Sequence, residues 1–150
     1  MIKRIINEKE ATICDELLTK LIRDESKYDK LISQDFKVYG YFKNIIKDNK
    51  NILLGYVIDN QIIGYTFLKY MPEDNNKGYL IDGLYIEEAY RRKGYAKELL
   101  EYAFKLLEKE TCDFVDINVI YANEIAKKLY KSFNLIISSY NLSFFILSTF

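Results

Sequence analysis

The segment from Arg91 to Ala96 combines positive charge with a glycine, and these residue types bind phosphate groups. It lies between an apolar stretch at residues 79–86 and an amphipathic helical pattern that runs to residue 107. The first N–H groups of a helix have no intrahelical partner and the helix dipole is positive there, so a bound anion gains donors and a favourable field. Gly94 would let the backbone approach such an anion closely, although an ordinary strand-to-helix turn with surface charge is the alternative. The predicted phosphate-binding residues are Arg91, Arg92, Lys93, Gly94, Tyr95 and Ala96.

The spacing of this loop excludes two common phosphate motifs and matches a third. Neither G-x-x-x-x-G-K-[ST] nor G-x-G-x-x-G occurs in the chain. The pattern Arg91-x-x-Gly94-x-Ala96 resembles the R/Q-x-x-G-x-G/A signature of the GCN5-related N-acetyltransferase (GNAT) superfamily. In that family the loop holds the pyrophosphate of acetyl-coenzyme A. The resemblance therefore implies acetyl-CoA as the acyl donor and no metal cofactor.

A second pattern, near the end of the chain, is also similar to the GNAT family. Asn123, Ala126 and Tyr130 have the spacing of N-x-x-A-x-x-x-Y-x-x-x-G-F, with Asn134 and Leu135 in place of the Gly-Phe pair. Seven residues of helix are about two turns, so Asn123 and Tyr130 would project from one face toward a ligand. Asn123 could instead be a plain N-cap, and Tyr130 could simply pack as an aromatic residue.

The resemblance implies roles for the strand that precedes the phosphate loop. In the family this strand separates from the next one, and the pantetheine arm lies in the gap. Leu84, Tyr85 and Ile86 would supply backbone groups to that arm and to the thioester carbonyl, stabilising the oxyanion that forms when an amine attacks. Gly83 predicts a bulge or a close approach of ligand in the same strand.

Two proton transfers accompany acetylation of an amine, and the resemblance implies a residue for each. Tyr130 would protonate the departing thiolate, because its usual pKa of about 10 exceeds that of a thiol at about 8.5. Asp82 would act as the base, directly or through water, or would attract a cationic substrate; an ion pair with a neighbouring Lys or Arg is an equal alternative. Cys112 could form an acyl-cysteine, but without histidine it is a poor nucleophile.

The hydrophobic pattern predicts the elements that position these residues. The order β-α-α-β-β-β-α-β-α-β-β indicates an α/β fold, a mixed and mostly antiparallel sheet flanked by helices, which is also the GNAT order. Asp59-Asn60 predicts a tight hairpin turn, and Asn134 suits the left-handed residue that ends a helix. The other predicted segments are strands at residues 1–6, 51–58, 61–71, 113–119, 135–140 and 142–150, and helices at residues 8–23, 35–47 and 122–133.

The length, the charge balance and the absence of histidine exclude several classes of protein. A length of 150 residues predicts one domain, residues 1–150, and the 22 basic and 22 acidic residues give no charged surface for nucleic acid or anionic membrane. The absence of histidine excludes Ser-His-Asp, Cys-His and His-based zinc chemistry. Cys14 and Cys112 are expected to be free thiols in a cytoplasmic protein. The apolar tail at residues 144–150 would permit a homodimer.

The sequence therefore predicts an N-acetyltransferase that acylates a primary amine of a small molecule, polyamine- or aminoglycoside-like, by direct attack in a ternary complex. Acidic residues between the first two helices would suit a cationic acceptor, although a solvated loop explains them equally well. The alternatives are an enzyme acting on protein N-termini or lysines, and a catalytically silent sensor of acyl-coenzyme A. These acidic residues are Asp24, Glu25, Asp29 and Asp35.

Overall fold

The computed structural model describes residues 1–120, 122–133, 136–137 and 143–146. Strands and helices alternate in the predicted order, with one 3-10 turn, η1 (Glu88–Tyr90), added before the third helix. The strands are β1 (Ile2–Arg4), β2 (Ile52–Ile58), β3 (Gln61–Tyr70), β4 (Gly78–Ile86), β5 (Phe114–Asn118), β6 (Ile136–Ile137) and β7 (Ser143–Ile146). The helices are α1 (Glu8–Glu25), α2 (Tyr41–Ile45), α3 (Tyr95–Lys109) and α4 (Glu124–Lys131).

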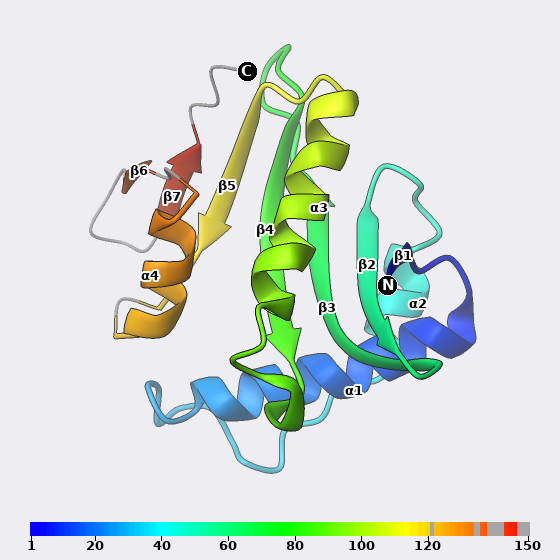
Figure 1. Cartoon of the computed structure of the whole chain (residues 1–150), viewed down its shortest axis with the longest axis vertical. Coiled ribbons are helices and arrows are strands. Elements are labelled where there is room, and N and C mark those ends of the chain that lie inside the picture. The colour runs from blue at the N-terminus through cyan, green and yellow to red at the C-terminus, as the bar shows by residue number, and fades with distance from the viewer. Residues whose placement is uncertain (121, 134–135, 138–142, 147–150) are drawn as a thin grey trace.

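All the described strands belong to one sheet with the order β1-β2-β3-β4-β5-β7-β6 (Figure 1). Every neighbouring pair is antiparallel except β4 and β5, which are parallel. Helix α3 makes the crossover between these two strands, as a parallel connection requires. The predicted mixed, mostly antiparallel α/β sheet is confirmed.

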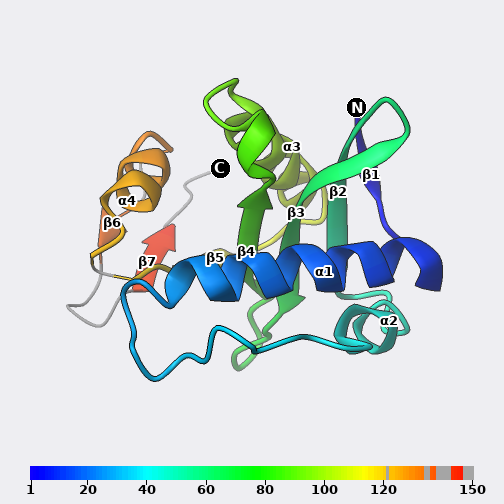
Figure 2. The ribbon, with the colours of Figure 1, turned by 90° about the horizontal axis from the view of Figure 1, so that it is seen from below.

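The helices cover the two faces of the sheet in pairs. Helices α1 and α2 lie on one face, and α3 and α4 lie on the other (Figure 2). Side chains alternate along each strand, so each face has its own core. On the α3 face the most deeply buried helix residues are Leu99, Leu100, Ala103 and Leu107. On the α1 face the core includes Ala11, Cys14, Leu17, Phe42, Tyr65 and Phe67.

The second helix is shorter than its pattern indicates. A helix at residues 35–47 was predicted, but α2 spans only Tyr41–Ile45, and that prediction was wrong in length. Gly40 precedes it in the left-handed conformation with φ 64°, which separates the helix from the residues before it. The first turn is held by tertiary contact instead, because the Phe42 N–H donates to Asp15 Oδ1 at 2.9 Å.

Two turn predictions have different outcomes. Asp59 and Asn60 have φ values of 48° and 62° between β2 and β3, so the predicted left-handed hairpin turn is confirmed. Asn134 lies outside the described residues. Of the strands predicted at 135–140 and 142–150, the structure describes only β6 at Ile136–Ile137 and β7 at Ser143–Ile146.

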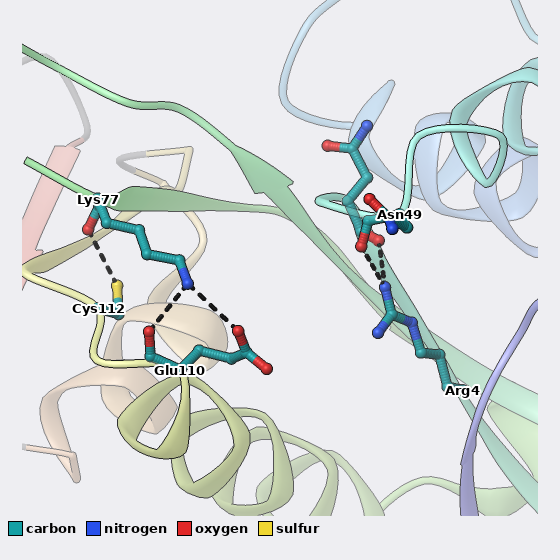
Figure 3. A network of polar contacts seen from close by, with 6 residues as sticks. Arg4, Asn49, Lys77, Glu110 and Cys112 are labelled. Carbon is teal, nitrogen blue, oxygen red and sulfur yellow. Dashed lines mark hydrogen bonds and ion pairs between the residues drawn. The ribbon is translucent and has the colours of Figure 1, made fainter.

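Polar side chains bind to the segments that connect several of these elements (Figure 3). Arg4 donates to the carbonyl oxygens of Asn49 at 2.6 Å and Asn51 at 3.0 Å. Lys77 Nζ donates to the Glu110 carbonyl oxygen at 2.9 Å, which ties the start of β4 to the end of α3. The Lys77 bond therefore joins β4 and α3 at the ends that lie opposite the loop at residues 91–94.

Candidate active site

Strands β4 and β5 pair over only half the length of β4. Their parallel register runs from Gly78 opposite Phe114 to Ile81 opposite Ile117, whereas β4 continues to Ile86. Beyond Ile81 the two strands diverge (Figure 1). The register between β3 and β4 also shifts at this point, which confirms the bulge predicted near Gly83. The sheet therefore opens where the resemblance places the pantetheine arm.

A cavity of about 470 Å³ begins at this opening. Its walls come from the end of α1, the second half of β4, the loop before α3, and the first turns of α3 and α4. Such a volume is typical of a small-molecule site. Nine of the twelve predicted site residues line it: Leu84, Tyr85, Ile86, Arg91, Arg92, Gly94, Tyr95, Ala96 and Asn123.

The other three predicted residues have different positions. Lys93 does not line the cavity, and its Nζ lies 5.5 Å from the ring centroid of Tyr90. Asp82 and Tyr130 are also absent from the described cavity wall. The Asp82 side chain is exposed on β4, and Tyr130 is buried on α4.

The phosphate loop has the backbone geometry of an anion site. Arg92 and Gly94 both have positive φ, 62° and 87°, and such left-handed residues turn successive N–H groups toward one concave side. No side chain caps the first turn of α3, so its N–H groups are available to a ligand. A Cβ on Gly94 would meet nothing within 4 Å, so the space over the loop is open. A pyrophosphate fits this loop by charge, donors and space.

Two ion pairs tie the loop to α1. The Arg91 guanidinium donates to Asp24 Oδ2 at 2.8 Å and to the Ile86 carbonyl oxygen at 2.9 Å. One turn earlier on α1, Lys20 pairs with Glu87. The end of α1 is therefore joined to the loop by two ion pairs. In one the loop supplies the positive side chain, and in the other α1 supplies it.

Asn123 combines both roles considered from the sequence. Its side chain accepts a hydrogen bond from the Ala126 N–H at 3.1 Å, so it is the N-cap of α4. It also lines the cavity. Ile125 also lines the cavity, and its side chain is 81% exposed.

Acidic groups and a phenol gather near the end of α1. The pKa of Glu25 is raised by burial and by the nearby charges of Asp24 and Asp82. The pKa of Asp82 is also raised, because surrounding protein excludes part of its water, while Lys69 partly opposes the shift. Within the described residues Asp82 forms no ion pair, so the alternative of a paired surface carboxylate is not favoured.

Tyr130 belongs to the same electrostatic neighbourhood. Burial, and then the charge of Glu25, raise the pKa of its phenol, so it stays protonated at neutral pH. Glu25 thus interacts with Asp82 on β4 and with Tyr130 on α4. Sequence reasoning named Glu25 only as an acidic residue of the connecting loop. It could not show that α1 brings this carboxylate to the opening in the sheet.

Several other cavity residues were also missed. The α1 residues could not be found from sequence, because they reach the wall only through the crossing of α1 beneath the sheet. Ile125 had a weak signal, as an apolar residue on the polar first turn of a helix. The missed wall residues include Leu21, Lys27, Tyr28, Tyr90, Lys97, Ile125 and Leu129.

The remaining candidate nucleophile lies elsewhere. The Cys112 thiol donates to the carbonyl oxygen of Phe114 at 2.9 Å, and burial raises its pKa. It does not line the described cavity. Acyl transfer through Cys112 is therefore not supported.

A sheet that opens between two parallel strands, beside a glycine loop at a helix N-terminus, is the arrangement that the sequence resemblance to the N-acetyltransferases implies. The sequence profile of the acetyltransferase (GNAT) family matches residues 16–134, and the chain belongs to this family. N-alpha-acetyltransferase 30 of Saccharomyces cerevisiae is 32% identical over 133 residues, covering 77% of this chain and 72% of the yeast protein. The chain is thus an N-acetyltransferase, and enzymes of its family use acetyl-coenzyme A.

Solved structures agree with this fold. A mutant of the BH1408 protein from Bacillus halodurans superposes with a TM-score of 0.78 at 19% identity, covering 93% of this chain and 94% of that protein. The aminoglycoside N-acetyltransferase AAC(6')-Iy in complex with CoA superposes with a TM-score of 0.73 at 13% identity, covering 93% of each chain.

Membrane-spanning helices and clusters of metal ligands are both absent from the described residues. No helix there is long and apolar enough to cross a membrane. Nor does that part of the chain hold a group of three or more His, Cys, Asp or Glu residues arranged to bind a metal ion.

Proposed function

We propose that this enzyme transfers the acetyl group of acetyl-coenzyme A to a primary amine of a cationic small molecule, by direct attack in a ternary complex. The observation that carries the proposal is the adjacency of two sites. The cavity is lined both by the loop around Gly94 and by Glu25. Glu25 lies close enough to Asp82 for the Asp82 charge to raise its pKa. An anionic donor and a cationic acceptor would thus meet at the opening between β4 and β5.

The coenzyme would be held mainly by backbone. The N–H groups of the loop around Gly94 would bind the pyrophosphate, with Arg92 adding charge. Asn123 and the apolar Ile125 would contact the arm from α4. When bound, the coenzyme supplies an acetyl thioester as the reactive group.

The second half of β4 would polarise the thioester carbonyl. Residues Leu84 to Ile86 pair with β3 on one side only, since β5 has diverged. In an antiparallel pair alternate residues point their N–H and C=O groups away from the partner strand, so some groups of this stretch face the opening. An N–H aimed there would stabilise the oxyanion as it forms.

Tyr130 would protonate the departing thiolate. Its phenol is kept protonated by burial and by the charge of Glu25, as a general acid requires. Glu25 and Asp82 would take the proton that the acceptor ammonium loses, directly or through water. Their raised pKa values bring them closer to the range of an effective base at neutral pH.

The acceptor is inferred from charge. Glu25, Asp24 and Asp82 lie together and would attract a polyamine or an aminoglycoside. A peptide N-terminus is the second candidate, because the yeast relative is named an N-alpha-acetyltransferase. Leu31 and Tyr39, in the connection between α1 and α2, are 94% and 76% exposed and would be free to contact a peptide chain.

The test is a thiol-release assay with acetyl-coenzyme A and three acceptor classes: spermidine, an aminoglycoside, and peptides with free N-termini. We expect the highest kcat/KM with one of the small cationic amines, with the acetylated product identified by mass. A preference for peptides would replace the small-molecule proposal by the second candidate. Coenzyme binding without turnover of any amine would indicate a silent sensor instead.

A further inference from the structure

The side chain of Arg91 is engaged in contacts with the protein itself, although the sequence resemblance groups it with the phosphate-binding residues. Its Nε donates to the Ile86 carbonyl oxygen at 2.9 Å, and its Nη2 donates to Asp24 Oδ2 at 2.8 Å. The guanidinium also lies over the ring of Tyr85, with 5.1 Å between Cζ and the ring centroid. These three contacts fix the planar group in one orientation, because its N–H donors form a rigid fork.

The Ile86 carbonyl lies on the edge of β4 that faces the opening in the sheet. The N–H of the next residue, Glu87, donates to the Ile63 carbonyl oxygen on β3 at 2.8 Å. A trans peptide unit points its N–H and C=O in opposite directions, so the Ile86 carbonyl points away from β3. Strand β5 pairs with β4 only as far as Ile81. Arg91 therefore donates to this carbonyl where a neighbouring strand would otherwise do so.

This edge of β4 is the one proposed to polarise the thioester. In an antiparallel pair each residue directs its N–H and its C=O to the same side, so the Ile86 N–H faces the opening together with its carbonyl. Donors stabilise an oxyanion most when their positions are fixed before the reaction. The second half of β4 lacks a neighbouring strand on this side, and Arg91 joins its last residue to Asp24 on α1 instead.

We propose that Arg91 is a positioning residue, which holds the end of β4 through the Ile86 carbonyl and keeps the N–H groups of this edge aimed at the thioester. This inference rests on the proposed function. It differs from the role that the resemblance implies, because the pyrophosphate is then bound by the loop N–H groups and by Arg92, which also lines the cavity. Arg91 acts on the reaction through the backbone of β4 and touches neither the acetyl group nor the acceptor.

The experiment measures Arg91→Ala and Arg91→Lys in the thiol-release assay, and their affinity for acetyl-coenzyme A in thermal melts. Lysine keeps the positive charge but has no planar fork to join Ile86 and Asp24. We expect both variants to reduce kcat about tenfold, less than the roughly 10²-fold loss from removing an oxyanion donor itself. The Kd of acetyl-coenzyme A should stay close to that of wild type in both.

Arg4→Lys is the matched control. Arg4 also donates to two carbonyl oxygens near a strand end, those of Asn49 and Asn51, and it does not line the described cavity. This variant loses the same kind of contact, so it should keep the wild-type kcat if position beside the opening is what matters. An equal loss of kcat in Arg4→Lys would trace the effect to general destabilisation and overturn the positioning role.

A phosphate ligand would give the reverse pattern. Arg91→Ala would then raise the Kd of acetyl-coenzyme A about tenfold, and lysine, which binds phosphate as a point charge, would restore it. That result needs no acceptor, and it would overturn the positioning role while leaving the proposed function intact. A wild-type kcat in both Arg91 variants would overturn the role as well. Failure of the wild-type enzyme to acetylate any amine would overturn the proposed function, and the positioning role with it.

Discussion

The two ends of the cavity are built in different ways. The proposed coenzyme end consists of consecutive residues, Arg91 to Ala96, whose backbone combines left-handed conformations with a helix N-terminus. The proposed acceptor end depends on single side chains of α1 and β4, namely Glu25 in the cavity wall and Asp82, whose charge raises the pKa of Glu25. A backbone site needs only a short motif, whereas a side-chain site depends on how distant elements pack. This difference predicts that changes at the two ends will affect different kinetic constants.

Tyr130 is the proposed general acid, and loss of its phenol should have the largest effect. We expect Tyr130→Phe to reduce kcat by about 10²-fold or more, because general acid catalysis typically contributes 10²–10⁴-fold. Affinity for acetyl-coenzyme A should be unchanged, as measured by the shift of a thermal melt. Tyr79→Phe is the control, because Tyr79 is also a buried tyrosine and does not line the described cavity. Equal loss of coenzyme binding and of kcat would mean that Tyr130 is structural.

Gly94→Ala tests the backbone nature of the coenzyme end. We expect the Kd of acetyl-coenzyme A to rise about tenfold or more, since the methyl group would enter the open space that the loop offers to a phosphate. Gly40→Ala is a matched control: its φ of 64° is also left-handed and its Cβ would find ordinary space. Both variants should lose about 1 kcal/mol of stability from the left-handed strain, but only Gly94→Ala should weaken the coenzyme. Equal coenzyme affinity in the two variants would argue against the loop as the phosphate site.

Glu25→Gln tests the side-chain nature of the acceptor end. Removing one nearby charge should raise the KM of a cationic acceptor about fivefold, equivalent to roughly 1 kcal/mol of Coulomb attraction, and leave the coenzyme affinity unchanged. Glu16→Gln, on the exposed side of the same helix, is the control.

The same variant should change the pH dependence of stability. The pKa of Glu25 is raised in the folded state, so folding favours its protonated form, and ionisation at neutral pH opposes folding. This penalty is absent below the unfolded pKa of about 4.3 and grows until the pH has passed the folded pKa. Glu25→Gln should therefore be slightly more stable than wild type at pH 7 and show no such advantage at pH 4. Thermal melts at both pH values check this, and a loss of stability at pH 7 would contradict it.

Asp24→Asn should have the smallest effect. It removes the ion pair between Arg91 in the loop and Asp24 on α1. The Arg91–Asp24 pair is solvent-exposed, with both side chains at least 40% accessible, so its loss should reduce stability by about 0–1 kcal/mol. Arg91 would then be available to the pyrophosphate, and we expect acetyl-coenzyme A to bind two- to threefold more tightly, a change of the same modest size. Lys20→Gln breaks the neighbouring pair with Glu87 without releasing Arg91, and should not tighten binding. Weaker coenzyme binding in Asp24→Asn would show that the ion pair helps to shape the loop.

The comparison also explains what the sequence could predict. The order of elements, the Asp59-Asn60 turn and the strand, loop and helix around Arg91–Ala96 were predicted correctly, because each depends on local periodicity or on residues suited to positive φ. The binding of phosphate by that loop stays a prediction. The length of α2 was not predicted correctly. The left-handed conformation of Gly40 and a hydrogen bond from the Phe42 N–H to Asp15 on α1 decide where this helix begins. The proximity of Glu25 to Asp82 was not predicted either, because it follows from the crossing of α1 beneath the sheet. No local pattern encodes that crossing.

The most direct test of the central claim is a thermal melt with saturating acetyl-coenzyme A, with NAD and ATP as controls. At a hundredfold excess over Kd, a ligand bound only to the folded state contributes about 2.7 kcal/mol. For a chain of this size we expect that to raise the Tm by roughly 5–10 °C, with acetyl-coenzyme A alone giving the shift. A folded sample that shows no shift, or an equal shift with NAD or ATP, would contradict the assignment of the Arg91–Ala96 loop as a coenzyme site.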